Sequence, residues 1–286
     1  MLLLLFISVV SAALCSIILH IAPLGGRSAI FRFNALSTTV WCTILFCLNG
    51  FCVRLDGIDV FWGVLYGIIQ ACFILSKTAA MSSGSVSVTT LIGNCSLLVS
   101  VIFSYFLFGE EITGTDLVGI ILLLLGLGLS AYRGEQIKLS KKWGAYAALF
   151  LLLGAGVGLS FKGFSRSGSS DAGNMMLIAS IVMLGLYSVF SVLIKDGDPE
   201  TRDRGKRGLF IVTALISGAL GCLYNRLNIY LSGELDAVIF FPLFNGGVVI
   251  LSGVLSILLL RERLSKRQIL GLIFGVIGIS IIGIFK

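Results

Sequence analysis

The segment FGEEIT at residues 108–113 recurs in altered form as LRERLS at residues 260–265. The offset between the two copies is 152 residues, and it aligns Glu110 with Glu262. The same offset aligns a series of small residues in and around the segment, namely Ser100 with Ser252, Ser104 with Ser256, Thr113 with Ser265, Gly119 with Gly271 and Gly126 with Gly278. A repeat kept at one offset over this length indicates that the chain consists of two homologous halves.

The composition assigns both halves to a lipid environment. Of the 286 residues, 57 % are hydrophobic and 12 % are charged, and the mean hydropathy is +1.05. A soluble domain has about 25 % charged residues, so this chain lacks the polar surface that water requires. The composition therefore excludes a cytoplasmic enzyme, a secreted disulfide scaffold and a nucleic-acid-binding protein, even though the net charge is +7.

The apolar runs predict transmembrane helices. A helix needs about 20 mostly apolar residues to cross a membrane, and these runs are continuous, whereas the strands of a membrane barrel alternate. We predict ten transmembrane helices joined by short loops, at 2–21, 33–53, 60–80, 86–108, 116–132, 144–164, 173–194, 208–231, 237–260 and 268–285. The first run lacks a positively charged start and a small-residue cleavage site, so we expect a mature helix there and not a signal peptide.

The predicted fold class is all-α and integral to the membrane, with ten transmembrane helices as two inverted five-helix repeats. The first repeat covers residues 1–135 and the second covers residues 142–286. Because five is odd, two homologous units in one chain must cross the membrane in opposite senses. Inverted repeats are the plan of many secondary transporters, which have a substrate site near the membrane midplane between the two halves.

The duplicated parts, 100–130 and 252–282, and the segment FPLFNG at 241–246 resemble the EamA-like, ten-helix branch of the drug/metabolite transporter superfamily. The resemblance extends over the whole chain. It implies a carrier, usually an exporter of amino acids, small metabolites or drugs, with a cavity lined mainly by helices one, three, four, six, eight and nine. The small drug exporters of this superfamily exchange protons through a Glu in helix one. Residues 1–21 contain no carboxylate, which disfavours export of multidrug cations.

Lys and Arg are distributed unequally between the two membrane sides. The side holding the loops after helices one, three, five, seven and nine has sixteen: Arg27, Arg32, Lys77, Arg133, Lys138, Lys141, Lys142, Lys195, Arg202, Arg204, Lys206, Arg207, Arg261, Arg263, Lys266 and Arg267. The opposite side has five: Arg54, Lys162, Arg166, Arg226 and Lys286. Because Lys and Arg accumulate on the cytoplasmic side, we expect both termini outside the cytoplasm, in a bacterial-type plasma (inner) membrane.

Two of the cations within the predicted spans, Lys77 and Arg226, are candidate substrate-binding residues. Lys77 is near the end of helix three, and Arg226 is in helix eight. Burying a charge in lipid is costly, so such residues are functional candidates. If both face the cavity, they favour an anionic or carboxylate-bearing substrate. The alternative is that each long side chain extends to the membrane surface and only anchors its helix.

Uncharged polar residues within the spans complete the predicted substrate-binding set: Asn94, Asn245, Gln70, Tyr66 and Asn228. The first two lie in the middle of helices four and nine, and Tyr66 and Gln70 share one face of helix three. An amide in lipid must find a partner, so hydrogen bonding between helices is the alternative role. In helix nine, Pro242 leaves a carbonyl group unpaired and available to a substrate.

The remaining polar and small residues have simpler interpretations. His20, at the end of helix one, is a candidate proton relay, or it simply contacts water. Seven Cys, at positions 15, 42, 47, 52, 72, 95 and 222, form no CxxC pair and are interpreted as small packing residues. We assign the repeated glycines to close helix packing and Glu110 and Glu262 to a structural role. We expect no metal and no cofactor.

The expected function is secondary transport of a small metabolite, amino acid-like or related, with export by alternating access. The chain contains no Walker A motif, no HExxH and no GxSxG, so we expect no enzyme and no catalytic residues. A carrier for organic anions or phosphorylated metabolites is the first alternative. A non-transporting membrane scaffold or scramblase is the second. The expected partners are a small-molecule substrate and membrane lipid, with no nucleic acid, and the expected state is a monomer or homodimer.

Overall fold

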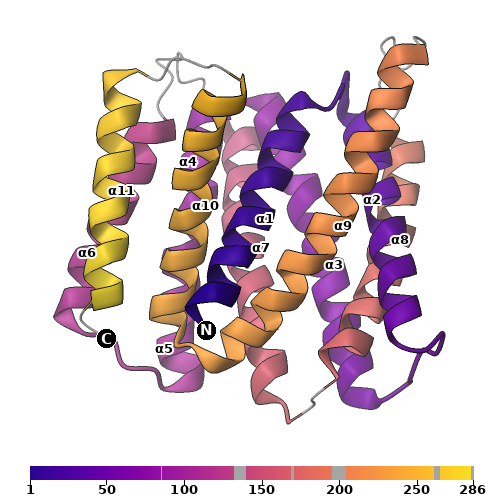
Figure 1. The fold of residues 1–286 in the computed structure, drawn as a ribbon, viewed down its shortest axis with the longest axis horizontal. Helices are drawn as coiled ribbons and strands as arrows, with labels where there is room; N and C mark the ends of the chain where they lie inside the picture. The colour runs from indigo at the N-terminus through magenta and orange to yellow at the C-terminus, as the bar shows by residue number, and fades with distance from the viewer. Residues whose placement is uncertain (85, 132–139, 169–170, 195–203, 261–264, 285–286) are drawn as a thin grey trace. The chain divides into compact units, whose positions relative to one another are not determined.

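The computed structural model describes residues 1–84, 86–131, 140–168, 171–194, 204–260 and 265–284, and these residues form α-helices and no strand (Figure 1). The helices are α1 (Leu2–Ile21), α2 (Arg27–Leu48), α3 (Gly57–Ser83), α4 (Val86–Asn94), α5 (Ser96–Phe108), α6 (Gly114–Ala131), α7 (Lys141–Arg166), α8 (Ala172–Leu193), α9 (Arg204–Glu234), α10 (Ala237–Leu260) and α11 (Lys266–Ile284).

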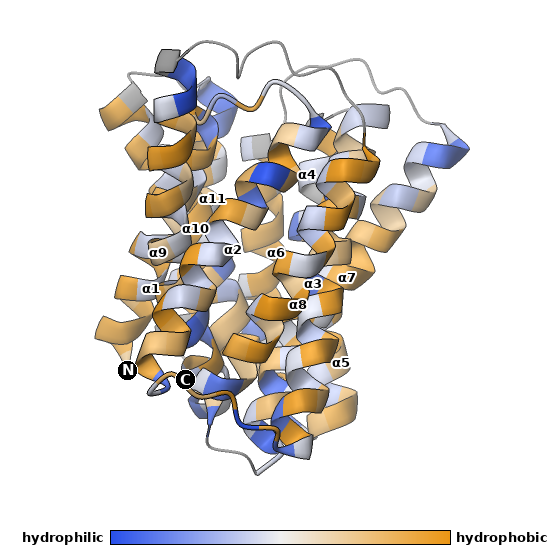
Figure 2. Ribbon diagram, turned by 90° about the vertical axis from the view of Figure 1, so that its right-hand side faces the viewer, coloured by the Kyte–Doolittle hydropathy of each residue, from blue (hydrophilic) through white to orange (hydrophobic). Residues whose placement is uncertain are grey.

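The described helices have the length and composition of membrane spans. Eight stretches of the described chain, one of them covering α4 and α5 together, are long and apolar enough to cross a membrane, and Gly114–Ser130 is a shorter apolar helix. Hydrophobic residues occupy most of the length of these helices (Figure 2). The chain is therefore an all-helical, multi-pass integral membrane protein, as its composition predicts.

The helices agree with the predicted spans except at two places. The second helix is displaced toward the N-terminus, since α2 begins at Arg27 and ends at Leu48. It ends there because Gly50 and Phe51 adopt positive φ angles of 66° and 58°, which a right-handed helix does not allow. The predicted helix at 86–108 is broken at Cys95, whose backbone N–H bonds to the carbonyl of Ile92 in place of an α-helical partner.

The chain divides into two compact units that differ from the two sequence halves. Unit 1 consists of Met1–Ala71 and Gly163–Tyr230, and unit 2 consists of Cys72–Lys162 and Leu231–Lys286. The division falls inside α3, α7 and α9. Each unit thus contains helices from both sequence halves, and the predicted repeats at 1–135 and 142–286 remain a prediction about sequence homology.

In unit 1 the second predicted span packs along the seventh. The Ser28 hydroxyl near the start of α2 donates to the Ser191 carbonyl near the end of α8, at 3.0 Å. The rings of Phe31 and Phe190 meet edge to face, with centroids 5.5 Å apart. Because the start of one helix meets the end of the other, α2 and α8 run antiparallel.

In unit 2 the fifth predicted span packs against the tenth through glycines. A Cβ added to Gly119 of α6 would lie 2.9 Å from the carbonyl oxygen of Gly278 in α11, and one added to Gly126 would lie 2.5 Å from that of Gly271. Only residues without a side chain allow two backbones to approach this closely. The two helices lie side by side in Figure 1, and the falling residue numbers along α11 show that they are antiparallel.

The same two helices begin with equivalent capping interactions. Before α6, Asp116 Oδ2 accepts from the backbone N–H of Thr113 at 2.9 Å, and the Thr113 hydroxyl accepts from the N–H of Asp116 at 3.3 Å. Before α11, Gln268 Oε1 accepts from the N–H of Ser265 at 2.9 Å, and the Ser265 hydroxyl accepts from the N–H of Gln268 at 3.3 Å. Both are capping boxes, and their positions differ by the 152 residues of the sequence repeat.

Candidate functional site

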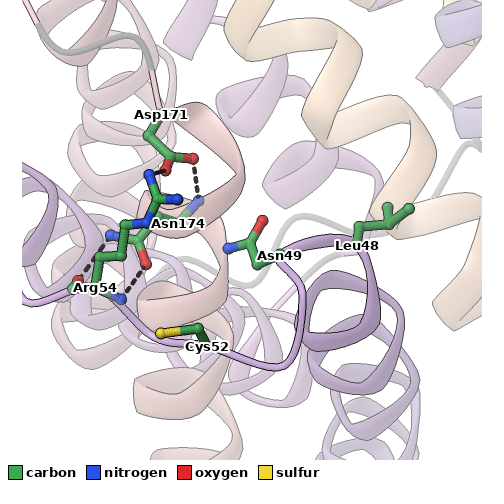
Figure 3. A pocket seen from close by; sticks show the side chains of 6 residues that line it. All are labelled: Leu48, Asn49, Cys52, Arg54, Asp171 and Asn174. Carbon is green, nitrogen blue, oxygen red and sulfur yellow. Dashed lines mark hydrogen bonds and ion pairs between the residues drawn. The ribbon is translucent and has the colours of Figure 1, made fainter.

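The described part of unit 1 contains a polar pocket of about 240 Å³ (Figure 3). It lies where the segment 49–56 between α2 and α3 meets the start of α8. The residues that line it are Leu48, Asn49, Cys52, Arg54, Asp171 and Asn174. All but Leu48 carry a polar or thiol group, so the pocket is suited to a polar solute.

Asn174 fixes the segment that forms one wall of the pocket. Its side chain is fully buried, and its Oδ1 accepts from the backbone N–H of Arg54 at 3.0 Å. Its Nδ2 donates to the backbone carbonyl of Arg54 and to Asp59 Oδ2, both at 2.8 Å. Asp59, in the first turn of α3, is only 2 % exposed. One amide therefore joins α8 to the backbone of residue 54 and to α3.

Asp171 and Arg54 form an accessible charge pair across the pocket. Asp171 is the N-cap of α8, and its Oδ1 accepts from the backbone N–H of Asn174 at 3.0 Å. Its Oδ2 lies 3.6 Å from Arg54 Nη1, and the two side chains are 38 % and 76 % exposed. An ion pair this exposed contributes little to stability. Its charges are therefore available to a solute at a low energetic cost.

Arg226, one of the residues predicted from the sequence, lies beside this pocket. A Cβ added to Gly173 would lie 2.8 Å from Asn49 Oδ1 and 3.7 Å from Arg226 Nη1. The missing side chain at Gly173 thus leaves room for an amide and a guanidinium next to Asp171. Arg226 is exposed on α9, as a cation that extends toward water would be.

Two other predicted residues, Tyr66 and Asn228, are buried in hydrogen bonds between helices of unit 1. Tyr66 is fully buried on α3, and its hydroxyl donates to Asn225 Oδ1 on α9 at 3.2 Å. The Ser8 hydroxyl of α1 donates to Asn228 Oδ1 at 2.6 Å. These bonds match the helix-linking role that was the alternative for both residues. Ser8 with Asn228 and Tyr66 with Asn225 thus form two buried hydrogen-bonded pairs. Asn225 directly precedes Arg226 on α9.

The structure does not bring the other predicted residues to the pocket. Asn94 is half-buried at the end of α4, directly before the break at Cys95. Asn245 is exposed on α10, and its Nδ2 donates to the Phe241 carbonyl of its own helix at 2.9 Å. Lys77 is half-buried on α3, six residues before the end of that helix. Each of these three belongs to unit 2.

Gln70 and His20 belong to unit 1 but do not line its pocket either. Gln70 Oε1 is buried and has no hydrogen-bond partner among the described residues. His20 is exposed in the last turn of α1. As for metals, the described residues contain no group of three His, Cys, Asp or Glu side chains that could hold an ion.

Unit 2 contains a buried ion pair between Lys162 and Glu110. The Lys162 side chain is 1 % exposed and the Glu110 side chain 4 % exposed, and their charged groups are in direct contact. Lys162 Nζ also donates to the Leu235 carbonyl at 2.6 Å, and Glu110 Oε2 accepts from the Ala237 N–H at 2.7 Å. The pair connects the end of α7, the segment after α5 and the start of α10. Glu262, which the repeat aligns with Glu110, lies outside the described residues.

Four residues described above are not among the predicted functional candidates: Arg54, Asp171, Asn174 and Lys162. All of them except Arg54 have a recognisable signal in the sequence. The sequence DAGN at 171–174 precedes an apolar run, which is the pattern of a helix N-cap. Lys162 interrupts an apolar run, and an ionisable residue in such a run indicates a partner. Arg54 has no local signal, because its importance comes from a contact with a segment more than 100 residues away.

Comparison with known proteins agrees with this architecture. Among the 29 matching chains of solved structures is one described as "Crystal structure of protein", with a TM-score of 0.78 and 14 % sequence identity over 99 % of this chain and 99 % of that chain. At this identity the match establishes a shared fold. No curated protein matches. The model of the EamA-like transporter family matches residues 1–132, which confirms the resemblance predicted from the sequence for the first part of the chain. The family match and the apolar helices support a membrane transporter of the drug/metabolite transporter type.

Proposed function

We propose that the chain is a secondary transporter that exports a small, amino acid-like metabolite by alternating access through two inverted repeats. The observation that carries this proposal is the glycine contact between α6 and α11. Gly119 meets Gly278 and Gly126 meets Gly271. At the offset of 152, the first contact maps onto the second when the two halves are exchanged, since 119 corresponds to 271 and 126 to 278.

This exchange symmetry supports an inverted repeat. A pseudo-two-fold axis relates two homologous segments. When the segments are exchanged, each of the two glycine contacts takes the place of the other, as such an axis requires. The axis relates antiparallel helices here, so the corresponding helices of the two halves cross the membrane in opposite senses. The equivalent capping boxes at 113–116 and 265–268 agree with the same relation. Inverted repeats of this kind are the basis of alternating access in secondary transporters.

The break at Cys95 supports a transport site in unit 2 near Asn94. In transporters, discontinuous helices carry substrate sites because their half-helix ends have free backbone groups. The carbonyl groups that end α4 and the Asn94 amide lie at such a break. We therefore propose Asn94 as a substrate-binding residue of unit 2, with Asn245 and Lys77 as further candidates in that unit. In unit 1, Gln70 is a separate candidate for substrate binding and His20 is the candidate proton relay.

The Lys and Arg distribution supports an orientation with both termini outside the cytoplasm, in a plasma membrane of bacterial type. The pocket of unit 1 then faces outward, because Arg54 and Arg226 belong to the side with five cations. A carrier for organic anions is the second candidate function. It is favoured by the position of Arg226 next to a polar pocket and by the half-buried Lys77.

Counterflow in proteoliposomes tests the proposal. The purified chain is reconstituted with one unlabelled L-amino acid inside, and accumulation of the same radiolabelled amino acid is measured, across a panel of amino acids. We expect counterflow for at least one neutral amino acid and its loss in Asn94→Ala. Counterflow of organic anions alone would instead establish the anion carrier. Movement of fluorescent lipid between leaflets without any solute counterflow would overturn transport and indicate a scramblase.

A further inference from the structure

We infer that the outward-facing pocket of unit 1 binds a small zwitterion, with the carboxylate of the ligand on Arg54 and its ammonium group on Asp171. The class of ligand rests on the proposed function, whereas the site is additional to the transport site near Asn94. Three properties of the pocket favour such a ligand: its charges, the way its walls are fixed, and its size.

The charge pair favours a ligand with both charges. Arg54 Nη1 and Asp171 Oδ2 are 3.6 Å apart, and both side chains are accessible. An anion that takes Arg54 draws this guanidinium away from Asp171 and adds a like charge beside that carboxylate. A cation that takes Asp171 does the same to Arg54. A zwitterion that enters between them gives each group a new partner, so no charge is left unpaired.

The frame of the pocket is fixed before any ligand arrives. Asn174 holds both backbone groups of Arg54, and its own N–H bonds to Asp171. The same amide reaches the buried carboxylate of Asp59. The backbone of Arg54 and the carboxylate of Asp171 are therefore both held by Asn174, and little backbone order has to be created on binding.

The size and the rim of the pocket select a small solute. Its volume of about 240 Å³ is below the range of about 300–1,000 Å³ that drug-sized ligands occupy. Asn49 lines the pocket and offers a donor and an acceptor.

Binding of amino acids to matched variants of the purified full chain tests the inference. The probes are the twenty L-amino acids, measured by equilibrium binding in detergent. For each one that binds, the deaminated acid and the decarboxylated amine are measured as well. We expect Arg54→Gln and Asp171→Asn each to weaken binding at the pocket about tenfold or more, because each removes a charged hydrogen-bond partner. Asn retains the N-cap at 171, so the second variant keeps its fold.

Two variants serve as controls for charge and for location. Arg207→Gln removes an exposed cation from the first turn of α9, about 28 Å along the helix from Arg226. Asp56→Asn removes an exposed carboxylate that does not line the pocket. Both should bind as the unmodified chain does. The exposed thiol of Cys52 reports on the pocket itself. Bound amino acid should slow its reaction with a maleimide, while Cys47, which is exposed but outside the pocket, reacts unchanged.

The outcomes separate this inference from the proposed function. It is supported if only zwitterions protect Cys52 and both pocket variants lose that protection. It is overturned if no amino acid protects Cys52, if the deaminated acid protects it equally well, or if Arg54→Gln keeps the protection of Cys52. If one of these results is obtained and counterflow is still observed, the proposal of a transporter stands and only the proposal of the zwitterion pocket is refuted. Conversely, if amino acids protect Cys52 but no counterflow is observed, the proposal of the zwitterion pocket stands and the proposal of a transporter is refuted.

Discussion

Lys162 and Glu110 are in direct contact in unit 2, and each is also bonded to the backbone that joins α9 to α10. Both side chains are almost completely buried. A buried pair costs much desolvation, and it holds together only because each charge has further hydrogen-bond partners. The contact joins three segments of unit 2 that are distant in sequence, so its loss should lower the stability of that unit.

Glu110→Gln should destabilise the chain by about 3–5 kcal/mol, because it leaves the Lys162 charge buried without its counter-charge. The free energy of unfolding, from a denaturant titration of the detergent-solubilised protein, is the measurement. Combining Glu110→Gln with Lys162→Met should cost less than the sum of the two single changes, since no charge then remains. Glu111→Gln, at the exposed neighbour, should change stability by less than about 0.5 kcal/mol. Strict additivity of the double variant would contradict an energetic coupling of the pair.

Gly126→Ala should also destabilise the chain, by about 1–3 kcal/mol. The new Cβ would lie 2.5 Å from the Gly271 carbonyl oxygen and 2.6 Å from the Gly275 nitrogen, so one backbone must move. The exchange symmetry predicts a similar cost for Gly271→Ala, whose Cβ would lie 2.6 Å from the Gly126 carbonyl oxygen. Gly185→Ala on α8 is the control, with no atom within 4 Å of its Cβ. It should be neutral or slightly stabilising. Equal stability of Gly126→Ala and the unmodified chain would refute the close α6–α11 contact.

Asn174→Ala should release the segment 49–56 from α8. The variant removes the partner of both backbone groups of Arg54 and of Asp59, at about 1–3 kcal/mol for each buried group left unsatisfied. Hydrogen exchange should therefore accelerate at the Arg54 amide and in the first turn of α3. Asn34→Ala, which removes only an amide bond to the carbonyl four residues earlier in α2, should leave exchange in 49–56 unchanged. Unaltered exchange in Asn174→Ala would mean that this amide does not fix the pocket wall.

The helices could be predicted from the sequence because continuous apolar runs define them, and ten predicted spans correspond to α1–α11 once the break at Cys95 is counted. Hydropathy did not indicate that break, because LIGNCS at 91–96 lies within one predicted apolar span. The repeat at 152 residues correctly singled out the glycines that meet between α6 and α11. The pocket could not be predicted, because Arg54 and Asn174 are 120 positions apart and the pattern around each is only that of a loop or a cap.

The ionisable candidates illustrate the same limit. A charge in an apolar run indicates that some partner or water is near, but the sequence does not say which. Lys162 proves to be buried against Glu110, whereas Arg226 is exposed beside Gly173. The two were indistinguishable by hydropathy. Their difference depends on which helix packs against each face, and this is decided by contacts far along the chain.

Cys52 should react with a membrane-impermeant maleimide in intact cells. In the proposed orientation, which follows from the uneven distribution of Lys and Arg, the segment after α2 lies outside the cytoplasm, and the Cys52 thiol is exposed. The readout is the fraction of Cys52 modified, by peptide mass, before and after the cells are opened. As the matched control, Gly25→Cys in a Cys52→Ser background puts an exposed thiol in the segment before α2. It should react only after opening, because α2 separates the two positions by one membrane crossing. The reverse pattern, with Gly25→Cys labelled in intact cells and Cys52 protected, would invert the orientation and turn the unit 1 pocket toward the cytoplasm.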